Sequence, residues 1–209
     1  MLGDRRDYSG EEITITPDNP DPIALWHRWL ADAIEAGSDE PTAAVVSTID
    51  EEGCPDARYV LIRVVDTGGF VFYTNYNSAK SRQLAASPHA SLVFGWLAQH
   101  RSVRVRGTVE LVDALNADRY FAGRPRGSQL SAWASHQSAA IPDRTHLEQQ
   151  MDSMQRRFAG TDVPRPAFWG GWRVIPRTIE FWQGQPDRLH DRIRYTQQAS
   201  SWTTERLAP

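Results

Sequence analysis

Residues 42–112 restrict the fold more than any other part of the chain, because they form a series of short β-branched runs separated by turns. The runs are TAAVVSTID (42–50), ARYVLIRVVD (57–66), FVFYTN (70–75), ASLVFGWL (90–97) and RSVRVRGTVELV (101–112). Connections as short as EEGCP and TGG predict antiparallel hairpins. In the last run valines alternate with charged residues, which predicts a sheet with one solvated face.

Helices are expected before, between and after these strands. The first has Asp21 as its N-cap, Pro22 in its first turn and Gly37 as its stop. A short helix is expected at 78–86, and a helical section at 113–160 that prolines interrupt. The segments WRVIPRTIEFWQG, RIRYTQQ and WTTERLAP are typical of final strands.

Hairpins with helices inserted between them predict an α+β fold built on an antiparallel β-barrel. We expect residues 1–20 to form a flexible polar arm and residues 21–209 to form one domain. No GxGxxG turn follows a strand, which argues against a doubly wound nucleotide-binding fold.

Composition and charge narrow the classes of function. The net charge of −3 comes from 23 basic and 26 acidic residues, so no global basic field points to nucleic acid as a partner. Cys54 is the only cysteine, which favours a reducing compartment. No apolar run approaches membrane-spanning length, and no signal-peptide core is present, so a cytoplasmic protein is expected.

Metal and hydrolase chemistry have little support. The six histidines form neither an HExxH pattern nor a close pair, and one cysteine cannot build a thiolate site. GxSxG and P-loop motifs are also absent from the sequence. No metal is therefore expected.

Two stretches suggest anion sites on or beside strands. In RYVLIR, Arg58 and Arg63 are five residues apart, so on a regular strand they point to opposite faces and serve two anions or two sides of one site. In YTNYNSAKSRQ, Ser78 and Lys80 lie where a strand passes into a helix, and free amides at a helix start favour phosphate.

A third anion site is indicated by YFAGRPRGSQLSAWASHQS. Tyr120 and Arg124 are one helical turn apart, and Pro125 makes Arg124 the expected last residue of its helix. Ser128 is then expected to cap the next helix and direct its hydroxyl and the nearby amides at a phosphate.

The stretch FWQGQPDRLHDR (181–192) places aromatic surface next to Arg188, His190 and Arg192. Each candidate also has a purely structural interpretation: a strand arginine as a solvated side chain, a serine as a helix cap, Tyr120 as packing, His190 as a structural hydrogen-bonding group. The co-occurrence of several phosphate-type sites with eight tryptophans favours two phosphorylated heterocycles bound together.

These blocks resemble the pyridoxamine (pyridoxine) 5′-phosphate oxidases, FMN enzymes of the split-barrel fold. The resemblance runs through RRDY, DPIALW, RYVLIR, FYTN, SAK, YFAGRPRGSQLSAWAS, FWGGWRV, FWQGQPDRLHDR and the terminal ERLAP, and so covers nearly the whole chain. It implies a homodimer of antiparallel split β-barrels with peripheral helices, in which FMN lies at the subunit interface.

The resemblance also implies roles for single residues. To FMN it assigns Arg58, Tyr59, Val60, Leu61, Arg63, Tyr73, Thr74, Lys80, Ser102, Gln137, Ser138, Trp182 and Arg192. To the substrate it assigns Arg5, Tyr8, Arg63, Tyr120, Arg124, Ser128, Arg188 and His190, with Arg188 and His190 as the catalytic pair. Arg5 and Tyr8 belong to an N-terminal arm that folds over the site in the family.

The family reaction moves a hydride from the C4′ carbon of pyridoxamine or pyridoxine 5′-phosphate to FMN, and O₂ then reoxidises the flavin, giving pyridoxal 5′-phosphate and H₂O₂. Because the flavin carries the redox chemistry, the protein supplies alignment and electrostatics. Arg188 and His190, two apart on an extended segment, are expected to share a face toward the pyridine ring.

Three positions depart from the family pattern. Arg63 stands where lysine is usual, and a forked guanidinium is not equivalent to an ammonium. Ala79 replaces a frequent arginine at the FMN phosphate, and Ser102 a frequent glutamine at the flavin. Each lost charged hydrogen bond costs about 1.5–3 kcal/mol, so we expect weaker FMN retention than is usual.

Two other functions remain open at this stage. One is a related split-barrel flavoenzyme that oxidises a different ring, as in phenazine pathways, although the trio Tyr120, Arg124 and Ser128 suits a phosphorylated substrate better. The other is a non-catalytic protein that binds FMN or pyridoxal phosphate. Turnover in air, with FMN added, separates them.

Overall fold

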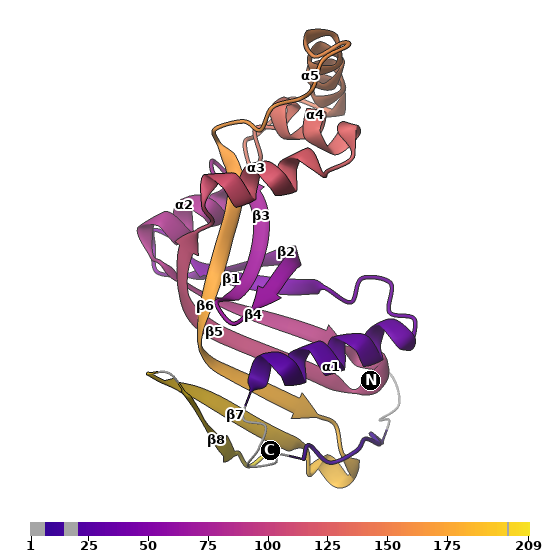
Figure 1. The fold of residues 1–209 in the computed structure, drawn as a ribbon, viewed down its shortest axis with the longest axis vertical. Helices are drawn as coiled ribbons and strands as arrows, with labels where there is room; N and C mark the ends of the chain where they lie inside the picture. Colours follow the sequence, from indigo (N-terminus) through magenta and orange to yellow (C-terminus); the bar gives the residue numbers. More distant parts are fainter. Residues whose placement is uncertain (1–6, 15–20, 200) are drawn as a thin grey trace.

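The computed structural model of the protein describes residues 7–14, 21–199 and 201–209 (Figure 1). The strands are β1 (Ala43–Ile49), β2 (Pro55–Asp66), β3 (Gly69–Asn75), β4 (His89–Trp96), β5 (Arg101–Leu111), β6 (Trp169–Gln183), β7 (Asp191–Gln198) and β8 (Ser201–Arg206). The helices are α1 (Pro22–Glu35), α2 (Ala79–Ala86), α3 (Ala114–Ala122), α4 (Arg126–Ala134) and α5 (Arg144–Arg157), with short 3₁₀ turns η1 (Leu97–Gln99) and η2 (Pro186–Arg188).

The strands form one antiparallel sheet in the order β3-β2-β1-β4-β5-β6-β7-β8. An additional pairing of β3 with β6 closes the first six strands into a barrel, and β7 and β8 continue outward from β6. Helices α3, α4 and α5 lie at one end of the molecule's long axis, and β7 and β8 lie at the other (Figure 1). The predicted α+β fold with an antiparallel barrel is confirmed.

Local sequence signals set the helix starts as predicted. The Asp21 side chain accepts a hydrogen bond from the Ile23 amide at the start of α1. Gly37, at φ +77°, follows the last turn in the left-handed conformation that glycine adopts without strain. Ser78 caps α2 by accepting from the Ser81 amide.

The prediction for the α3–α4 connection was wrong in two details. Helix α3 ends at Ala122, so Arg124 is not its last residue but lies in the connection. Pro125 occupies the N-cap position of α4, and Ser128 is the third residue of that helix instead of its cap. Proline has no N–H and a φ suited to a helix start, so the helix begins directly after it.

Strand β6 is unusually long, and a local irregularity at its centre lets it bend. The register between β5 and β6 shifts between Arg106 and Gly107, where Gly107 pairs with Pro176. A Cβ on Gly107 would lie 1.8 Å from the Ile175 carbonyl oxygen, so only glycine fits this close approach.

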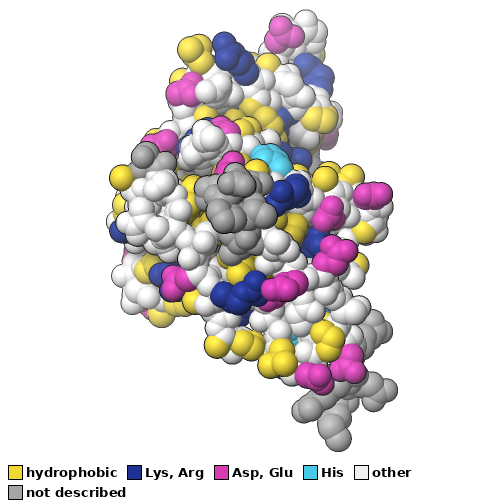
Figure 2. Space-filling view, turned by 60° about the horizontal axis from the view of Figure 1, so that its bottom comes forward, with side chains coloured by type: hydrophobic (Ala, Val, Ile, Leu, Met, Phe, Trp, Pro, Cys, Tyr) yellow, Lys and Arg dark blue, Asp and Glu magenta, His cyan; other side chains and the backbone are white. Residues whose placement is uncertain are grey.

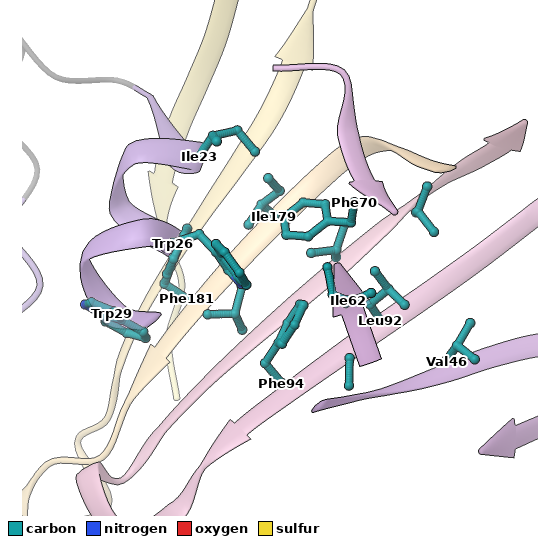
Figure 3. Packing of buried hydrophobic residues seen from close by; sticks show 14 of the residues in the cluster. Ile23, Trp26, Trp29, Val46, Ile62, Phe70, Leu92, Phe94, Ile179 and Phe181 are labelled. Atoms are coloured by element: carbon teal, nitrogen blue, oxygen red, sulfur yellow. The ribbon is translucent and has the colours of Figure 1, made fainter. Parts of the chain in front are cut away.

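The main core fills the barrel and its end under α1. Trp26 and Trp29 of α1 point at Phe94 and Phe181 on the barrel strands (Figure 3). The Trp29 and Phe181 rings meet edge to face at 5.1 Å. A second cluster packs α3, α4 and α5 together around Trp169 at the start of β6. Much of the tryptophan content therefore serves packing.

The surface carries charges of both signs. Basic, acidic and hydrophobic side chains are intermixed over the face in Figure 2, and no single-sign patch dominates it. Within the described residues, no helix has the length and apolar character needed to span a bilayer.

Candidate active site

Lys80 is the centre of the first anion site. The side chain is 8% exposed, and its ammonium donates to Thr74 Oγ1 (3.3 Å), Ser78 Oγ (3.3 Å) and Gln137 Oε1 (3.2 Å). All three acceptors are neutral, so the charge has no carboxylate partner in direct contact among the described residues. Burial, together with the nearby Arg58 guanidinium, lowers the pKa of Lys80 to about 8.

Lys80 is also the only lysine in the chain, since the other 22 of its 23 basic residues are arginines. Arginine stays charged in proteins, whereas lysine is a compact ammonium whose pKa responds to burial. The presence of a single lysine in the sequence could therefore have singled out this position.

Arg58 lies next to this site within a network of polar side chains. Its guanidinium forms an ion pair with Asp56 and donates to Thr48 Oγ1 (2.5 Å) and Gln83 Oε1 (3.2 Å). Hydrogen bonds from Gln83, followed by the charge of Arg58, lower the pKa of the Asp56 carboxyl. The network holds the Arg58 guanidinium near enough to Lys80 for its charge to affect the pKa of that lysine, and the assignment of Arg58 to FMN stays a prediction.

The start of α2 adds further donors and acceptors to the Lys80 site. The Ala79 amide donates to Ser138 Oγ at 3.2 Å, which connects the helix start to the segment after α4. Ser138 has φ +72°, a left-handed conformation that is uncommon for serine. Ala79 itself has no side-chain donor to offer.

Arg124 forms a second cationic site in the same region. Its Nη1 atom is buried without a hydrogen-bond partner among the described residues, and burial lowers the pKa of the group. Arg63 lies close enough to lower it further by charge repulsion. The Tyr120 ring stacks on Tyr73 with centroids 3.8 Å apart. Buried, unpaired donors of this kind suit an anionic ligand.

One cavity is lined by Arg124 and by two of the hydrogen-bond partners of Lys80. It has a volume of about 570 Å³, and its wall includes Tyr73, Thr74, Arg124, Gln137 and Trp169. Thr74 and Gln137 are also the partners of Lys80. We call the group Arg58, Arg63, Tyr73, Thr74, Lys80, Tyr120, Arg124, Gln137 and Ser138 the phosphate half-site. From helix α4, Ser131 lines the cavity wall, but Ser128 does not. The role of Ser128 at the substrate phosphate therefore stays a prediction.

Four more of the predicted residues, Tyr8, Ser102, Trp182 and Arg192, line a second cavity of about 690 Å³. The His190 ring lies 4.7 Å from Trp182 and 5.6 Å from Tyr8. The Arg188 guanidinium lies 5.8 Å from the Tyr8 ring. We call Tyr8, Ser102, Trp182, Arg188, His190 and Arg192 the ring half-site.

The backbone fixes the tautomer of His190 in this half-site. The Gln185 amide donates to His190 Nδ1 at 3.1 Å, so Nδ1 is an acceptor and carries no proton in the neutral ring. The proton of the neutral imidazole is therefore on Nε2, which is free to donate to a ligand. Asp187 and Arg188 both have positive φ values, 54° and 64°, which points to a constrained functional loop.

Glu180 positions Arg192. Its buried carboxylate accepts from Arg192 Nε (3.1 Å) and Nη2 (2.8 Å) on one side and from Arg104 Nη2 (2.5 Å) on the other. Arg192 Nη1 donates to the Ala208 carbonyl at 2.9 Å. Strand pairing aligns Trp182 with Arg192, so both side chains reach the same cavity.

The part of the N-terminal arm that the structure describes lies along the ring half-site. Ile13 is buried in the main core, and its amide donates to Asp191 Oδ2 at 3.0 Å. Gln185 Nε2 donates to the Glu11 carbonyl at 3.3 Å. Tyr8 then reaches His100 at 4.5 Å between ring centroids. Arg5 lies outside the described residues.

Within one chain the two half-sites are far apart. Trp169 and Gln183 are the ends of the 15-residue strand β6, which has a length of roughly 45 Å along its bent path. The phosphate half-site lies at the Trp169 end, beside β3, and the ring half-site lies at the Trp182 end, beside β7. No single cavity described here contains residues of both half-sites.

Some positions were missed by the sequence analysis or are still open. Trp169 and Glu180 were missed, because their roles come from strand pairing between distant segments. Tyr59 is 78% exposed, and its assignment to FMN, like those of Val60 and Leu61, stays a prediction. No metal-binding cluster of three acidic, histidine or cysteine side chains occurs in the described ranges.

Comparison with known proteins gives consistent matches. Residues 30–157 match the family model "Pyridoxamine 5′-phosphate oxidase", and residues 169–209 match "Pyridoxine 5′-phosphate oxidase C-terminal dimerisation region". A pyridoxine/pyridoxamine 5′-phosphate oxidase from Cyanothece sp. is 47% identical over 98% of this chain and 96% of its own. One from Synechocystis sp. is 52% identical over 90% and 88%, respectively.

A solved structure agrees with the fold over the whole chain. PhzG from Burkholderia lata, in complex with tetrahydrophenazine-1-carboxylic acid, superposes with a TM-score of 0.86 at 31% identity, covering 96% of this chain and all of that one. An FMN-binding protein from Nostoc punctiforme has the same fold, with a TM-score of 0.72 at 16% identity. Apart from Tyr8, all residues of both half-sites lie within the two family-model matches, and the chain belongs to the pyridoxamine 5′-phosphate oxidase family.

Proposed function

We propose that the protein is an FMN-dependent oxidase that converts pyridoxamine 5′-phosphate, pyridoxine 5′-phosphate or both to pyridoxal 5′-phosphate, with O₂ as oxidant and H₂O₂ as product. The observation that carries this proposal is a pair of cations without carboxylate partners within the described residues: Arg124 in the wall of one cavity, and Lys80 behind Thr74 and Gln137 of the same wall. Lys80 has neutral partners, and Arg124 has a buried, unpaired nitrogen within the described residues, so each suits one anion. FMN and a phosphorylated pyridine bring one phosphate each.

The donor set around Lys80 fits the phosphate of FMN. Lys80 and Arg58 supply charge, and Ser138 and the start of α2 supply hydrogen-bonding groups. The absence of a side-chain donor at Ala79 leaves the site with one fewer cation than many relatives have, and we expect weaker FMN retention as a consequence.

Arg124 and Arg63 suit the phosphate of the substrate. Their mutual repulsion in a partly buried setting favours a bound anion between or beside them. Tyr120 is held in place by stacking on Tyr73, which supports a role for its hydroxyl at the same phosphate. The hydroxyl of Ser128, the third residue of α4, is the remaining candidate donor.

A homodimer brings the two half-sites together. One chain separates them by the length of β6, and the chain's 169–209 segment matches a dimerisation region. A two-fold axis that places the ring half-site of one copy on the phosphate half-site of the other completes two equivalent sites. Trp182, Ser102 and Arg192 of one copy then face a flavin whose phosphate the other copy holds.

The protein's own groups orient the reactants. Bound FMN would supply the redox chemistry, which is the two-electron oxidation of the substrate at C4′ and the reduction of O₂ to H₂O₂. With pyridoxamine 5′-phosphate, water would replace the nitrogen, which leaves as ammonia. Arg188 holds the pyridine ring in attack geometry and polarises it. His190 donates a hydrogen bond from Nε2, because its Nδ1 is occupied by the Gln185 amide. Glu180 keeps the Arg192 fork directed at the cavity.

Turnover with FMN and air tests the proposal. Each phosphorylated substrate, supplied separately, is expected to give pyridoxal 5′-phosphate and H₂O₂ in equal amounts. Arg188→Ala and His190→Ala are each expected to lower kcat/KM by about 100-fold while FMN stays bound, since they act on the substrate ring. Two variants with wild-type turnover would contradict the assigned roles.

The alternatives predict different outcomes in the same assay. A protein that FMN cannot reconstitute refutes the flavin assignment. Bound FMN without oxidation of either substrate favours an enzyme for another ring, as the likeness to PhzG suggests, or a non-catalytic binding protein. The buried Nη1 atom of Arg124, which has no partner among the described residues, favours the phosphorylated substrate over these two.

A further inference from the structure

Arg124 lies against aromatic rings in its cavity, and no carboxylate of the described residues pairs with it. Its Cζ atom lies 4.5 Å from the centroid of the Trp169 ring and 5.5 Å from that of Phe121. Its Nη1 is buried and has no partner within the described part of the chain. Arg58, at the neighbouring anion site, is instead paired with Asp56. The two arginines are therefore fixed in different ways.

Trp169 is itself rigidly placed by the fold. The residue is 6% exposed and begins β6, where it pairs with Asn75 of β3. Its carbonyl accepts from Arg165 Nη1 at 2.7 Å. Its ring is nearly parallel to those of Tyr73 (9°, 5.7 Å) and Tyr120 (6°, 6.2 Å). The Trp169 ring thus lies near Tyr73, which is assigned to FMN, and near Tyr120 and Arg124, which are assigned to the substrate phosphate.

An aromatic support has a chemical consequence for Arg124. A carboxylate partner would occupy guanidinium N–H groups and cancel their charge. The face of a tryptophan attracts the cation through its π-electrons and leaves the N–H groups at the edge of the guanidinium free. A guanidinium held this way keeps both its charge and its donors for an anion that enters the cavity.

We propose that Trp169 is a positioning residue that holds Arg124 ready for the substrate phosphate, and that the preference for phosphorylated over unphosphorylated substrates depends on it. This inference rests on the proposed function, because it assumes that Arg124 binds that phosphate. Trp169 acts through Arg124 and is not itself expected to contact the reacting atoms.

The variants Trp169→Phe, Trp169→Leu and Trp169→Met separate this role from plain packing. Phenylalanine keeps an aromatic face, whereas leucine and methionine keep apolar volume without one. Trp133→Leu is the matched control, because Trp133 packs in the same second cluster and carries a different arginine, Arg157, at 4.8 Å from its ring. All four variants are assayed as FMN-reconstituted full-length protein.

For Trp169→Leu and Trp169→Met we expect KM for pyridoxine 5′-phosphate to rise about tenfold, with kcat within about twofold of wild type. The kcat/KM for unphosphorylated pyridoxine, which lacks the group that Arg124 binds, is expected to stay unchanged. Trp169→Phe is expected to restore most of the affinity. Trp133→Leu should lower the Tm without changing KM for pyridoxine 5′-phosphate or kcat/KM for unphosphorylated pyridoxine.

A second measurement needs no turnover. Inorganic phosphate is expected to raise the Tm of the wild-type protein. Arg124→Ala is expected to reduce this rise, because it removes one of the phosphate sites. Trp169→Leu should show the same reduction, whereas Trp133→Leu should keep the full rise. Equal effects of the Trp169 and Trp133 variants on Tm, KM and phosphate stabilisation would overturn the inference and leave Trp169 as a core residue only.

The two proposals fail in different ways. A wild-type protein that oxidises neither substrate, but whose stabilisation by phosphate depends on Trp169, refutes the proposed function and leaves the positioning role in place. An active wild type whose KM is indifferent to all three Trp169 variants refutes the positioning role alone.

Discussion

At the scale of single residues, two cations of the phosphate half-site, Lys80 and Arg124, have no carboxylate partner among the described residues. Lys80 is buried among neutral oxygens, and Arg124 has a buried nitrogen without a partner in the described ranges. Such groups cost free energy in the absence of an anion, since burial removes water without supplying a counter-charge. Binding of a phosphate returns part of that cost as affinity.

The titration of Lys80 provides a direct test. Its pKa of about 8 means that the ligand-free protein loses the proton as the pH rises through 8. A phosphate dianion beside Nζ favours the charged form and raises the pKa. Binding between about pH 8 and 10 is therefore expected to take up a proton. FMN affinity is expected to be flat between about pH 7 and pH 8, where the phosphate is a dianion and Lys80 is charged, and to fall above pH 8.

The absence of other lysines makes this titration measurable. Reductive ¹³C-methylation labels only Lys80 and the N-terminal amine, so the lysine signal needs no assignment by mutation. Its midpoint is expected near pH 8 without ligand and higher with FMN, while Lys80→Met, as control, shows only the signal of the terminal amine. A midpoint near the ordinary lysine value, with no response to FMN, would exclude Lys80 from the phosphate site.

Residue identities were predictable from the sequence where a local pattern marks them. Ser78, Lys80, Arg124 and Tyr120 lie in short motifs at helix ends, and the structure brings them to one region. Glu180 was not predictable, because a glutamate in an alternating strand is ordinarily solvated, and only the pairing of β6 with β5 and β7 places it between two arginines.

At the scale of elements, β6 organises the molecule. Its first residues close the barrel against β3, its centre pairs with β5, and its last residues carry the ring half-site. A strand that serves three neighbours has to bend, and the bend falls where Gly107 faces Pro176. Sequence patterning gave the strands correctly, but it contained no signal for the closure of β3 on β6, which joins residues about 100 positions apart.

Gly107→Ala is expected to be strongly destabilising. The new Cβ would lie 1.8 Å from a backbone oxygen, so β5 and β6 would have to separate, at a cost of about 3 kcal/mol in the free energy of unfolding. Gly127→Ala is the control: no atom lies within 4 Å of its new Cβ, and alanine in helix α4 is expected to add about 0.5–1 kcal/mol. Urea unfolding of both variants decides whether the close approach at Gly107 is essential.

At the scale of the whole molecule, the separation of the half-sites is the main feature. The continuous strand β6 joins them, and the described part of the chain has no hinge along it that would bring Arg124 to Arg188. The sequence predicted the members of both half-sites, but their distance depends on the direction and length of β6 in space. An assembly of two copies resolves the separation without any change in the fold of either.

Mixed dimers of two inactive variants test this arrangement. Arg124→Ala removes the phosphate half-site and Arg188→Ala the ring half-site, so each variant alone is expected to be nearly inactive. If each site combines half-sites from two copies, a mixed dimer has one site with both defects and one site with neither. Random reassociation of equal amounts makes about half of the dimers mixed and restores about a quarter of wild-type activity. Sites formed within single chains would restore none, because every site would keep one defect, and that outcome would refute the shared site while leaving the family assignment in place.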